Sequence, residues 1–193
     1  MKIDNRKDIL LLFLYSPGIT TEFNEPIVGR TKLVKGLFLF KEEALDHFKK
    51  GTHITKDNFY EFFAWDFGPF SKEIYDDITF FILNNFICTR ASEQESLPEA
   101  AAEWNRWVDS SGINLDDNNI WEYQEEEFTL SEPKGITFTK ELYNSLSDSQ
   151  KKILKEFKSK IISSSLRAII RYVYKQYPDL ITKSKIKDKI LEF

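Results

Sequence analysis

The sequence predicts a mainly helical α+β protein with a winged-helix-like core, a small β-hairpin or sheet and a C-terminal helical extension. The segments follow one another in the order helix, helix, strand, helix, hairpin, helices. Helical segments repeat apolar residues every three to four positions, whereas strand candidates are aromatic-rich or alternate apolar with polar residues. The chain has 193 residues, of which 41% are hydrophobic and only 7 are Gly. Such a composition supports a dense core and argues against wholesale disorder.

The first two helices are predicted from apolar spacing and from signals at their ends. Residues 4–15 are apolar on most sides, which indicates a short buried helix, and a Ser-Pro-Gly sequence follows at 16–18. A longer amphipathic helix is predicted over 31–50, with Thr31 as its N-cap. Gly51 follows its basic last turn, as helix C-termini prefer.

An aromatic strand and a third helix come next. Residues 59–67 are predicted as a strand that Gly68 and Pro69 break. Pro fixes φ, Gly permits a positive φ, and Ser71 can cap the helix that follows. We therefore predict a structural turn at Gly68, Pro69 and Ser71, then a helix with its core face between 74 and 86. A short strand is predicted at 87–89.

The second half begins with a change of composition. Residues 91–119 hold few large apolar groups and are predicted to be a surface insertion with one short helix at about 100–108. Residues 120–130 and 135–143 alternate apolar with polar residues, which predicts a hairpin with one buried face. The Glu-rich part of its first strand is interpreted as a solvated sheet edge.

Basic helices end the chain. A helix is predicted over 149–162, capped by Ser147 or Asp148, and Pro178 separates a last pair at 165–177 and 183–191. We expect two parts: residues 1–147 form the winged-helix-like core with the acidic insertion at about 91–119. Residues 148–193 form a basic helical extension packed on that core.

Charge is unevenly distributed along the chain. The formal net charge is −4, but residues 1–90 carry −1, residues 91–149 carry −11 and residues 150–193 carry +8. A basic surface of this kind fits nucleic acid or an acidic protein surface. It also complements the acidic segment within the same molecule.

No enzyme or metal signature is present. The sequence lacks the glycine-rich phosphate loops and the nucleophile and zinc motifs of common enzyme classes. His47 and His53 lie near Asp46 and Asp57, and we interpret them as exposed polar residues, since zinc sites usually need three or four ligands. The lone Cys88 is interpreted as a buried, inert thiol. We predict no catalytic residues, no cofactor and no metal.

The expected location is the cytoplasm. No apolar run reaches the roughly 20 residues that span a bilayer, and the charged N-terminus lacks a signal-peptide cleavage site. A single Cys allows no internal disulfide, which fits a reducing compartment. We expect no membrane partner, and the oligomeric state is not predicted.

Seven residues are candidate contacts for a partner or for nucleic acid. Cations at the start of the second helix and in the C-terminal helices suit phosphates or acidic side chains, and two aromatic residues flank the Gly-Pro turn. A solvated helix face is the alternative interpretation for the cations, and a purely structural turn is the alternative for the aromatic pair. The candidates are Arg30, Lys32, Lys35, Phe67, Phe70, Arg167 and Arg171.

Two segments resemble a known family. Residues 29–44 (GRTKLVKGLFLFKEEA) and 67–78 (FGPFSKEIYDDI) resemble the YwgA-like proteins, and more distantly they are similar to the Panacea domain of bacterial toxin–antitoxin loci. The matching residues are Lys32, Leu33, Lys35, Leu37, Phe38, Gly68, Pro69, Tyr75 and Asp76. The segments 136–146 and 166–188 resemble the closing hairpin and the C-terminus of these families, so the resemblance spans most of the chain outside 91–119. Phe70 departs from the pattern, which has a small aliphatic residue after Gly-Pro.

The resemblance implies a non-enzymatic, winged-helix-like module that neutralises toxins by protein contact. We therefore expect a non-catalytic protein-interaction module, antitoxin-like or an accessory subunit of a bacterial or phage conflict (defence) system. Its protein partner would be a toxin or defence effector encoded nearby. The alternative is a winged-helix DNA-binding regulator that uses Arg30, Lys32, Lys35 and the C-terminal lysines. An enzyme with a carboxylate site ranks third.

Overall fold

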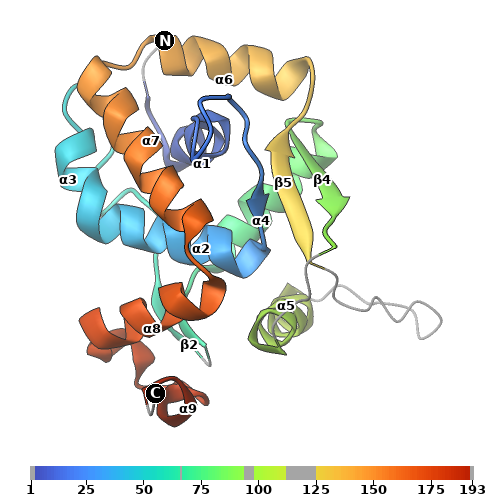
Figure 1. Ribbon diagram of the computed structural model, residues 1–193, viewed down its shortest axis with the longest axis vertical. Helices are drawn as coiled ribbons and strands as arrows, with labels where there is room; N and C mark the ends of the chain where they lie inside the picture. Colours follow the sequence, from blue (N-terminus) through green and yellow to red (C-terminus); the bar gives the residue numbers. More distant parts are fainter. Residues whose placement is uncertain (1–2, 66, 94–97, 112–124, 192–193) are drawn as a thin grey trace.

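The computed structural model describes residues 3–65, 67–93, 98–111 and 125–191 (Figure 1). It is a mixed α+β fold that is mainly helical, as predicted from the sequence. The strands form a three-stranded sheet and a separate two-stranded hairpin. The winged-helix-like arrangement of the core stays a prediction at this point.

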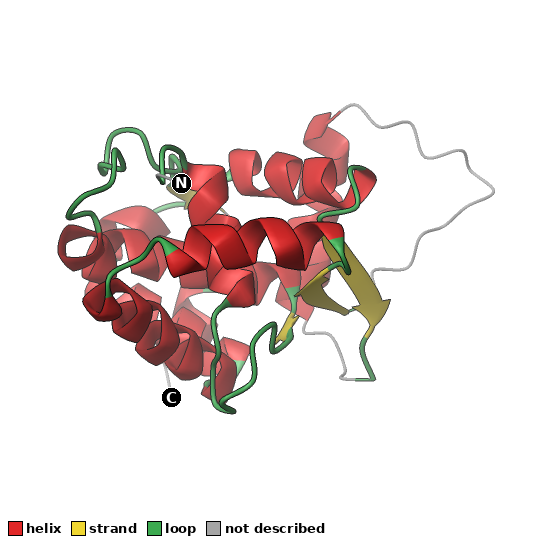
Figure 2. Ribbon diagram, turned by 90° about the horizontal axis from the view of Figure 1, so that it is seen from above, coloured by secondary structure: helices red, strands yellow, loops and turns green. Residues whose placement is uncertain are grey.

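Helix α1 (Arg6–Tyr15) lies at the centre of the molecule, between α6 (Lys134–Asn144), α7 (Asp148–Ser163) and the three-stranded sheet (Figures 1 and 2). Its residues from Asp8 to Tyr15 are all buried. Asn5 and Asp8 form a capping box at its start, which satisfies backbone N–H groups that a helix leaves unpaired. The predicted helix over 4–15 and its burial are confirmed.

The second predicted helix is confirmed but is not uniform. Helix α2 (Arg30–Leu39) continues into a π-helix, η1 (Phe40–Ala44), and then into α3 (Leu45–Phe48). The predicted N-cap, Thr31, is wrong, because Gly29 occupies that position with a φ of 94°. This positive φ strains any residue that has a Cβ, and a Cβ on Gly29 would also displace the carboxylate of Glu125, so glycine suits the entry to α2.

The Gly68-Pro69 pair does not break a strand. Strands β2 (Phe63–Trp65) and β3 (Gly68–Phe70) pair antiparallel, with Trp65 opposite Gly68. The expected structural turn is therefore wrong: Gly68 and Pro69 belong to the returning strand of a hairpin. Pro is tolerated there because the hairpin has only two strands and both are edges. Ser71 does stand at the N-cap of α4 (Lys72–Leu83), but its side chain makes no cap bond.

The three-stranded sheet has the order β1-β5-β4 and is antiparallel. Its strands are β1 (Ile27–Val28), β4 (Ile87–Ala91) and β5 (Glu126–Leu130). The strand predicted at 87–89 is confirmed, and the predicted strand 120–130 is confirmed over 126–130. The interpretation of the Glu-rich run as a solvated edge is wrong: β5 is the central strand and Glu125 is buried.

The hairpin predicted from 120–130 and 135–143 is wrong, because residues 134–144 form helix α6. Its buried residues recur at helical spacing: Gly135, Thr139, Leu142 and Tyr143. Gly135 allows the start of α6 to lie against β4, since a Cβ there would be 2.1 Å from the carbonyl oxygen of Phe86. The apparent alternation rested on Ile136 and Phe138 alone, too few residues to separate a strand from a helix.

The acidic insertion contributes to the core. Its helix is α5 (Pro98–Ser111), with Ala100, Glu103 and Trp107 buried. The predicted helix is confirmed, but the expectation of a surface segment is wrong for residues 98–111. The remaining parts of the insertion at 94–97 and 112–119 lie outside the described residues.

Three helices and a 3-10 turn end the chain. α7 begins with a capping box at Ser147, as predicted, and is followed by α8 (Leu166–Gln176), η2 (Pro178–Ile181) and the short α9 (Lys187–Leu191). α8 packs on α2, and η2 packs on β2 and β3. Among the described residues, no helix is both long and apolar enough to cross a bilayer.

Candidate interaction surface

The first candidate contact, Arg30, is directed into the protein. Only 3% of it is exposed, and its Nη2 donates to Oε2 of Glu126 at 2.9 Å. Its guanidinium carbon lies 4.6 Å from the ring centre of Trp104 and 5.3 Å from that of Phe128, distances typical of cation–π contacts. The Trp104 ring belongs to α5, so the acidic insertion covers this cation. The expectation that Arg30 contacts a partner is wrong.

Lys35 is also buried, contrary to its expected place on a solvated face. Its Nζ lies 2.7 Å from Oε2 of Glu103, and neither side chain has any exposed surface. The same Nζ donates to the carbonyl oxygen of Pro69 at 2.9 Å, and the hydroxyl of Tyr75 donates to the other oxygen of Glu103 at 3.2 Å. The ammonium and the carboxylate are therefore each held by the other and by a polar neighbour, so Lys35 does not offer a surface contact.

The remaining candidates near α2 are partly or fully covered. Lys32 is half-buried: its Nζ donates to the carbonyl oxygen of Ile162 at 3.1 Å, and burial lowers its pKa. Phe67 and Phe70 are both buried, so the expected aromatic docking site beside the Gly-Pro pair is wrong. Arg30 and Lys35 instead link α2 to β3 and α5, and Lys32 links α2 to α7.

The C-terminal candidates lie closer to the surface. Arg167 is exposed, as a contact residue requires, whereas Arg171 is half-buried and its Nε donates to the carbonyl oxygen of Ile190 at 3.3 Å. One lysine of the basic helix faces inward: Lys158 has no exposed surface and donates to the carbonyl oxygens of Leu14 and Ser16 at 2.6 and 2.8 Å. Burial lowers its pKa to about 7.

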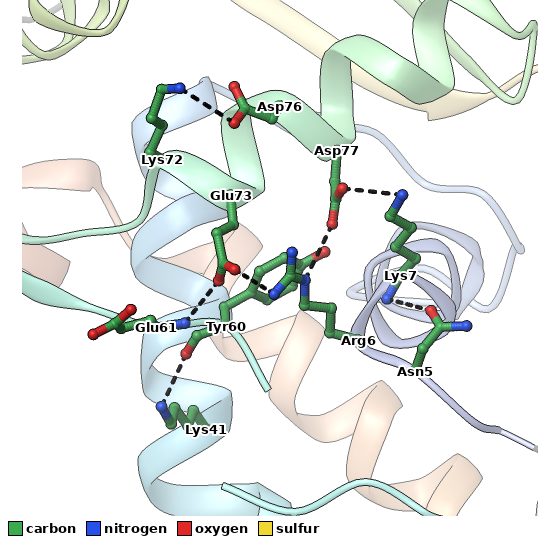
Figure 3. A network of polar contacts seen from close by, with 10 residues as sticks. All are labelled: Asn5, Arg6, Lys7, Lys41, Tyr60, Glu61, Lys72, Glu73, Asp76 and Asp77. Carbon is green, nitrogen blue, oxygen red and sulfur yellow. Dashed lines mark hydrogen bonds and ion pairs between the residues drawn. The ribbon is translucent and has the colours of Figure 1, made fainter. Parts of the chain in front are cut away.

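A network of ion pairs holds α4 against α1 (Figure 3). Arg6 at the start of α1 pairs with Glu73, and its Nε lies 3.5 Å from Oδ2 of Asp77. Lys7 Nζ lies 3.3 Å from the other oxygen of Asp77. The backbone N–H of Glu61 donates to Glu73 at 3.0 Å. The carboxylates of Glu73 and Asp77 are therefore both held by contacts within the protein.

Tyr60 completes this network from the segment before β2. Its ring lies under the guanidinium of Arg6 at 5.1 Å, and Lys41 donates to its carbonyl oxygen at 2.9 Å. Burial and the neighbouring Asp77 raise the pKa of the Tyr60 hydroxyl well above its ordinary value. The carboxylates are paired with cations, so the network positions α4 against α1.

The side of α4 next to this network is open and carries two large apolar side chains. Phe80 is 47% exposed and Leu83 is 78% exposed. They are three positions apart, which places both on one side of the helix together with Asp76 and Lys72. We call Asp76, Phe80 and Leu83 the α4 surface. The sequence interpretation followed only the buried face of this helix. The sequence signal that could have revealed this surface is the presence of Phe80 and Leu83 on the side of the helix away from its buried residues.

Lysines and further aromatic rings surround the α4 surface. Lys7 Nζ lies 4.4 Å from the ring centre of Phe80, and Lys134 Nζ lies 4.6 Å from that of Phe86. Phe80 contacts Phe81, which contacts Phe86, with ring centres 5.5 and 5.6 Å apart. Aromatic residues with a polar rim are typical of protein–protein interfaces.

The remaining chemistry-bearing side chains in the described part of the chain are dispersed. No group of three or more His, Cys, Asp or Glu residues there is arranged to hold a metal ion. His53 pairs with Asp4 at 3.0 Å in an exposed position. Cys88 is half-buried in β4 rather than fully buried as expected.

Comparisons with protein-family models, with curated proteins and with solved structures gave no match.

Proposed function

We propose that this chain is a non-catalytic protein-interaction module that docks its partner on the α4 surface. In this proposal it acts in the cytoplasm as an antitoxin-like protein or an accessory subunit of a bacterial or phage conflict system. The partner is a toxin or defence effector encoded nearby. The assignment to a conflict system rests on the resemblance of residues 29–44 and 67–78 to YwgA-like and Panacea proteins.

The observation that carries the proposal is the exposure of Phe80 and Leu83 on a helix that ion pairs anchor along the adjoining side. Exposed aromatic and aliphatic side chains grouped on one face mark binding surfaces more often than isolated ones do. The ion pairs of Glu73 and Asp77 fix the helix in place before binding. A preorganised surface loses less conformational entropy when it binds, which favours affinity.

The alternative of a winged-helix DNA-binding regulator has less support. It needs Arg30 and Lys35 at the surface, and both are buried. The order of elements α1, β1, α2, α4, β4, β5 and the strand order β1-β5-β4 favour a winged-helix-like core. In that arrangement α4 takes the place of the helix that enters the major groove. The cation on its open side, Lys72, lies 3.7 Å from the carboxylate of Asp76, and the rest of that side is the apolar Phe80 and Leu83, whereas phosphate contacts need free cations.

The test is co-expression with the product of the neighbouring gene in the native locus. We expect the two proteins to purify together, and Leu83→Asp to weaken the complex at least tenfold because it places a charge in an apolar contact. Gln176→Asp is the matched control, since it adds the same charge at an exposed position on α8. Equal binding by the Leu83→Asp variant would contradict the assigned surface.

Fluorescence anisotropy with duplex DNA at about 50 mM salt tests the alternative. We expect no binding above the non-specific level. Tight binding that weakens steeply with added salt would favour the regulator instead.

A further inference from the structure

The helices that end the chain carry an excess of cations outside the α4 surface. Residues 165–191 hold seven Lys and Arg side chains and two Asp side chains, which gives a formal charge of +5. Figure 1 places α8 and α9 at the end of the molecule opposite α6. Within the part of the chain that the structure describes, no ion pair involves Arg167, Arg171 or Lys175. Contacts within the fold therefore do not neutralise these three cations.

The three cations form a line along one side of α8. Arg167, Arg171 and Lys175 are each four positions apart, so they follow one another on the same side of the helix. Arg167 and Lys175 are exposed, and Arg171 is half-buried. We call these three residues the α8 cationic stripe, which spans about 12 Å along the helix axis. Like charges at this spacing repel one another, so the stripe does not stabilise α8.

The central arginine of the stripe is held in place by its neighbouring helix. The Nε of Arg171 donates to the carbonyl oxygen of Ile190 in α9 at 3.3 Å. No carboxylate of the described residues lies within ion-pair distance of its guanidinium, so both terminal nitrogens remain for another acceptor. A guanidinium presents these donors in a planar fork that fits the two oxygens of a carboxylate. Its fixed position lowers the entropy that is lost on binding.

The carboxylates near α8 do not pair with the stripe. Asp179 in η2 and Asp188 in α9 are both exposed, and neither forms an ion pair among the residues that the structure describes. Glu43 in η1 accepts a hydrogen bond from the hydroxyl of Tyr177 at 3.2 Å. Even when these three carboxylates are all counted against the seven cations of residues 165–191, the charge of this region stays positive.

We propose that the α8 cationic stripe binds an acidic peptide segment of a partner protein. Successive cations of the stripe are about 6 Å apart along the helix axis. Carboxylates four positions apart on a helix have the same spacing, and carboxylates two positions apart on a strand have nearly the same spacing. Such a segment can therefore place one carboxylate on each cation. This surface is separate from the α4 surface and does not depend on the function proposed above.

Two observations favour an acidic peptide over nucleic acid as the occupant. The stripe has three cations over about 12 Å, whereas a nucleic-acid backbone continues its phosphates far beyond that length. The chain as a whole has a formal net charge of −4, which repels a long polyanion once it extends past the stripe. Two of the three cations are arginines, which are enriched at protein–protein interfaces, whereas lysine is depleted there.

The test uses fluorescence anisotropy of a fluorescein-labelled oligoglutamate peptide with the full chain at about 50 mM salt. We expect saturable binding that weakens as salt is added. The triple variant Arg167→Gln/Arg171→Gln/Lys175→Gln should weaken binding more than about tenfold, since each exposed ion pair contributes a few-fold. The matched control, Lys140→Gln/Lys152→Gln/Lys155→Gln, removes the same charge from exposed positions on α6 and α7 and should bind almost as the wild type does.

A second variant covers the case in which loss of Arg171 loosens α9. Arg167→Gln/Lys175→Gln keeps the contact with Ile190, and we expect it to show an intermediate loss of peptide binding. Far-UV circular dichroism and the melting temperature establish that each variant is folded. Absence of saturable peptide binding to the wild type, or an equal loss in the control variant, would overturn the proposal. Tighter binding of duplex DNA than of the peptide, lost in the triple variant, would overturn it in favour of nucleic acid.

Discussion

Lys35 and Glu103 have no exposed surface, so each charge depends on the other for compensation. We expect Lys35→Met to lower the free energy of unfolding by about 3–5 kcal/mol, because it leaves the Glu103 carboxylate buried without a cation. The measurement is urea denaturation followed by Trp fluorescence, since Trp104 and Trp107 lie on the same helix as Glu103.

The double variant Lys35→Met/Glu103→Leu is the control for this prediction. It removes both charges together, and apolar replacement of a buried pair is often neutral or stabilising. We therefore expect it to recover most of the stability that Lys35→Met loses. Additive losses from the two single changes would show that the ion pair is not the source of the effect.

Lys158 makes stability depend on pH. Its ordinary pKa of 10.5 falls to about 7 in the folded protein, mainly because of burial, while Glu25 acts in the opposite direction. Between these two values the unfolded chain binds more protons than the folded one, so stability rises with pH. We expect a slope of up to about 1.4 kcal/mol per pH unit between pH 8 and 10.

Denaturation curves of the wild type and of Lys158→Met across this range isolate the contribution. The variant should lose most of the slope, because Met has no proton to release. Above about pH 10 the trend should reverse, since Tyr60 keeps its proton in the folded state and loses it on unfolding. Parallel curves for the two proteins would refute the assignment to Lys158.

Sequence patterns did not identify which cations are buried, for a physical reason. Lys158 shares its helix with Lys151, Lys152 and Lys155. All four are lysines, so residue type does not separate the buried one from the exposed ones. Only the tertiary structure places the carbonyl oxygens of Leu14 and Ser16 within reach of one of them. Burial of a charge depends on a partner that is distant in sequence, and single-sequence periodicity does not encode such a partner.

At the scale of elements, Gly68 joins the β2–β3 hairpin to α8. Its φ is +87°, and a Cβ there would lie 2.9 Å from Cε1 of Tyr174. We expect Gly68→Ala to destabilise the protein by more than about 1 kcal/mol, because it adds both backbone strain and a steric clash. Thermal unfolding measures the effect.

Gly51 provides a matched control within the same chain. Its φ is +80°, but a Cβ there would meet nothing within 4 Å. Gly51→Ala therefore reports the backbone strain alone and should cost less than Gly68→Ala. Equal losses would mean that the contact with Tyr174 contributes nothing.

The helices with strong local signals were predictable from the sequence. The boundaries of α1 and α7 follow from capping residues and from apolar spacing, which are local properties. α6 was mistaken for a strand because its buried set includes Gly135 and Thr139, which carry no hydrophobic signal. The α4 surface was missed for a related reason. Phe80 and Leu83 are exposed because no other element packs over them, and a local sequence pattern does not encode the packing of distant elements.

At the scale of the whole molecule, the acidic segment is not simply opposed to the basic one. Glu103 and Glu126 lie within the −11 segment of residues 91–149, and they pair with Lys35 and Arg30 of the N-terminal part. Part of the acidic excess is thus neutralised inside the core. The C-terminal helices keep most of their positive charge at the surface, where it remains open to a partner.

The C-terminal helices and the N-terminal part share packing contacts, and this predicts cooperative unfolding. The ring of Tyr177 lies 4.9 Å from that of Phe38, and η2 packs on the β2–β3 hairpin. All four Trp residues precede residue 148, so their fluorescence reports on the core alone. We expect fluorescence and far-UV circular dichroism to give one coincident thermal transition, as a single cooperative unit requires.

A chain ending at residue 164 should have a lower melting temperature by Trp fluorescence, because the truncation uncovers Phe38 and the β2–β3 hairpin. An unchanged midpoint in the shortened chain, or two separate transitions in the full one, would instead identify residues 165–193 as an independent appendage.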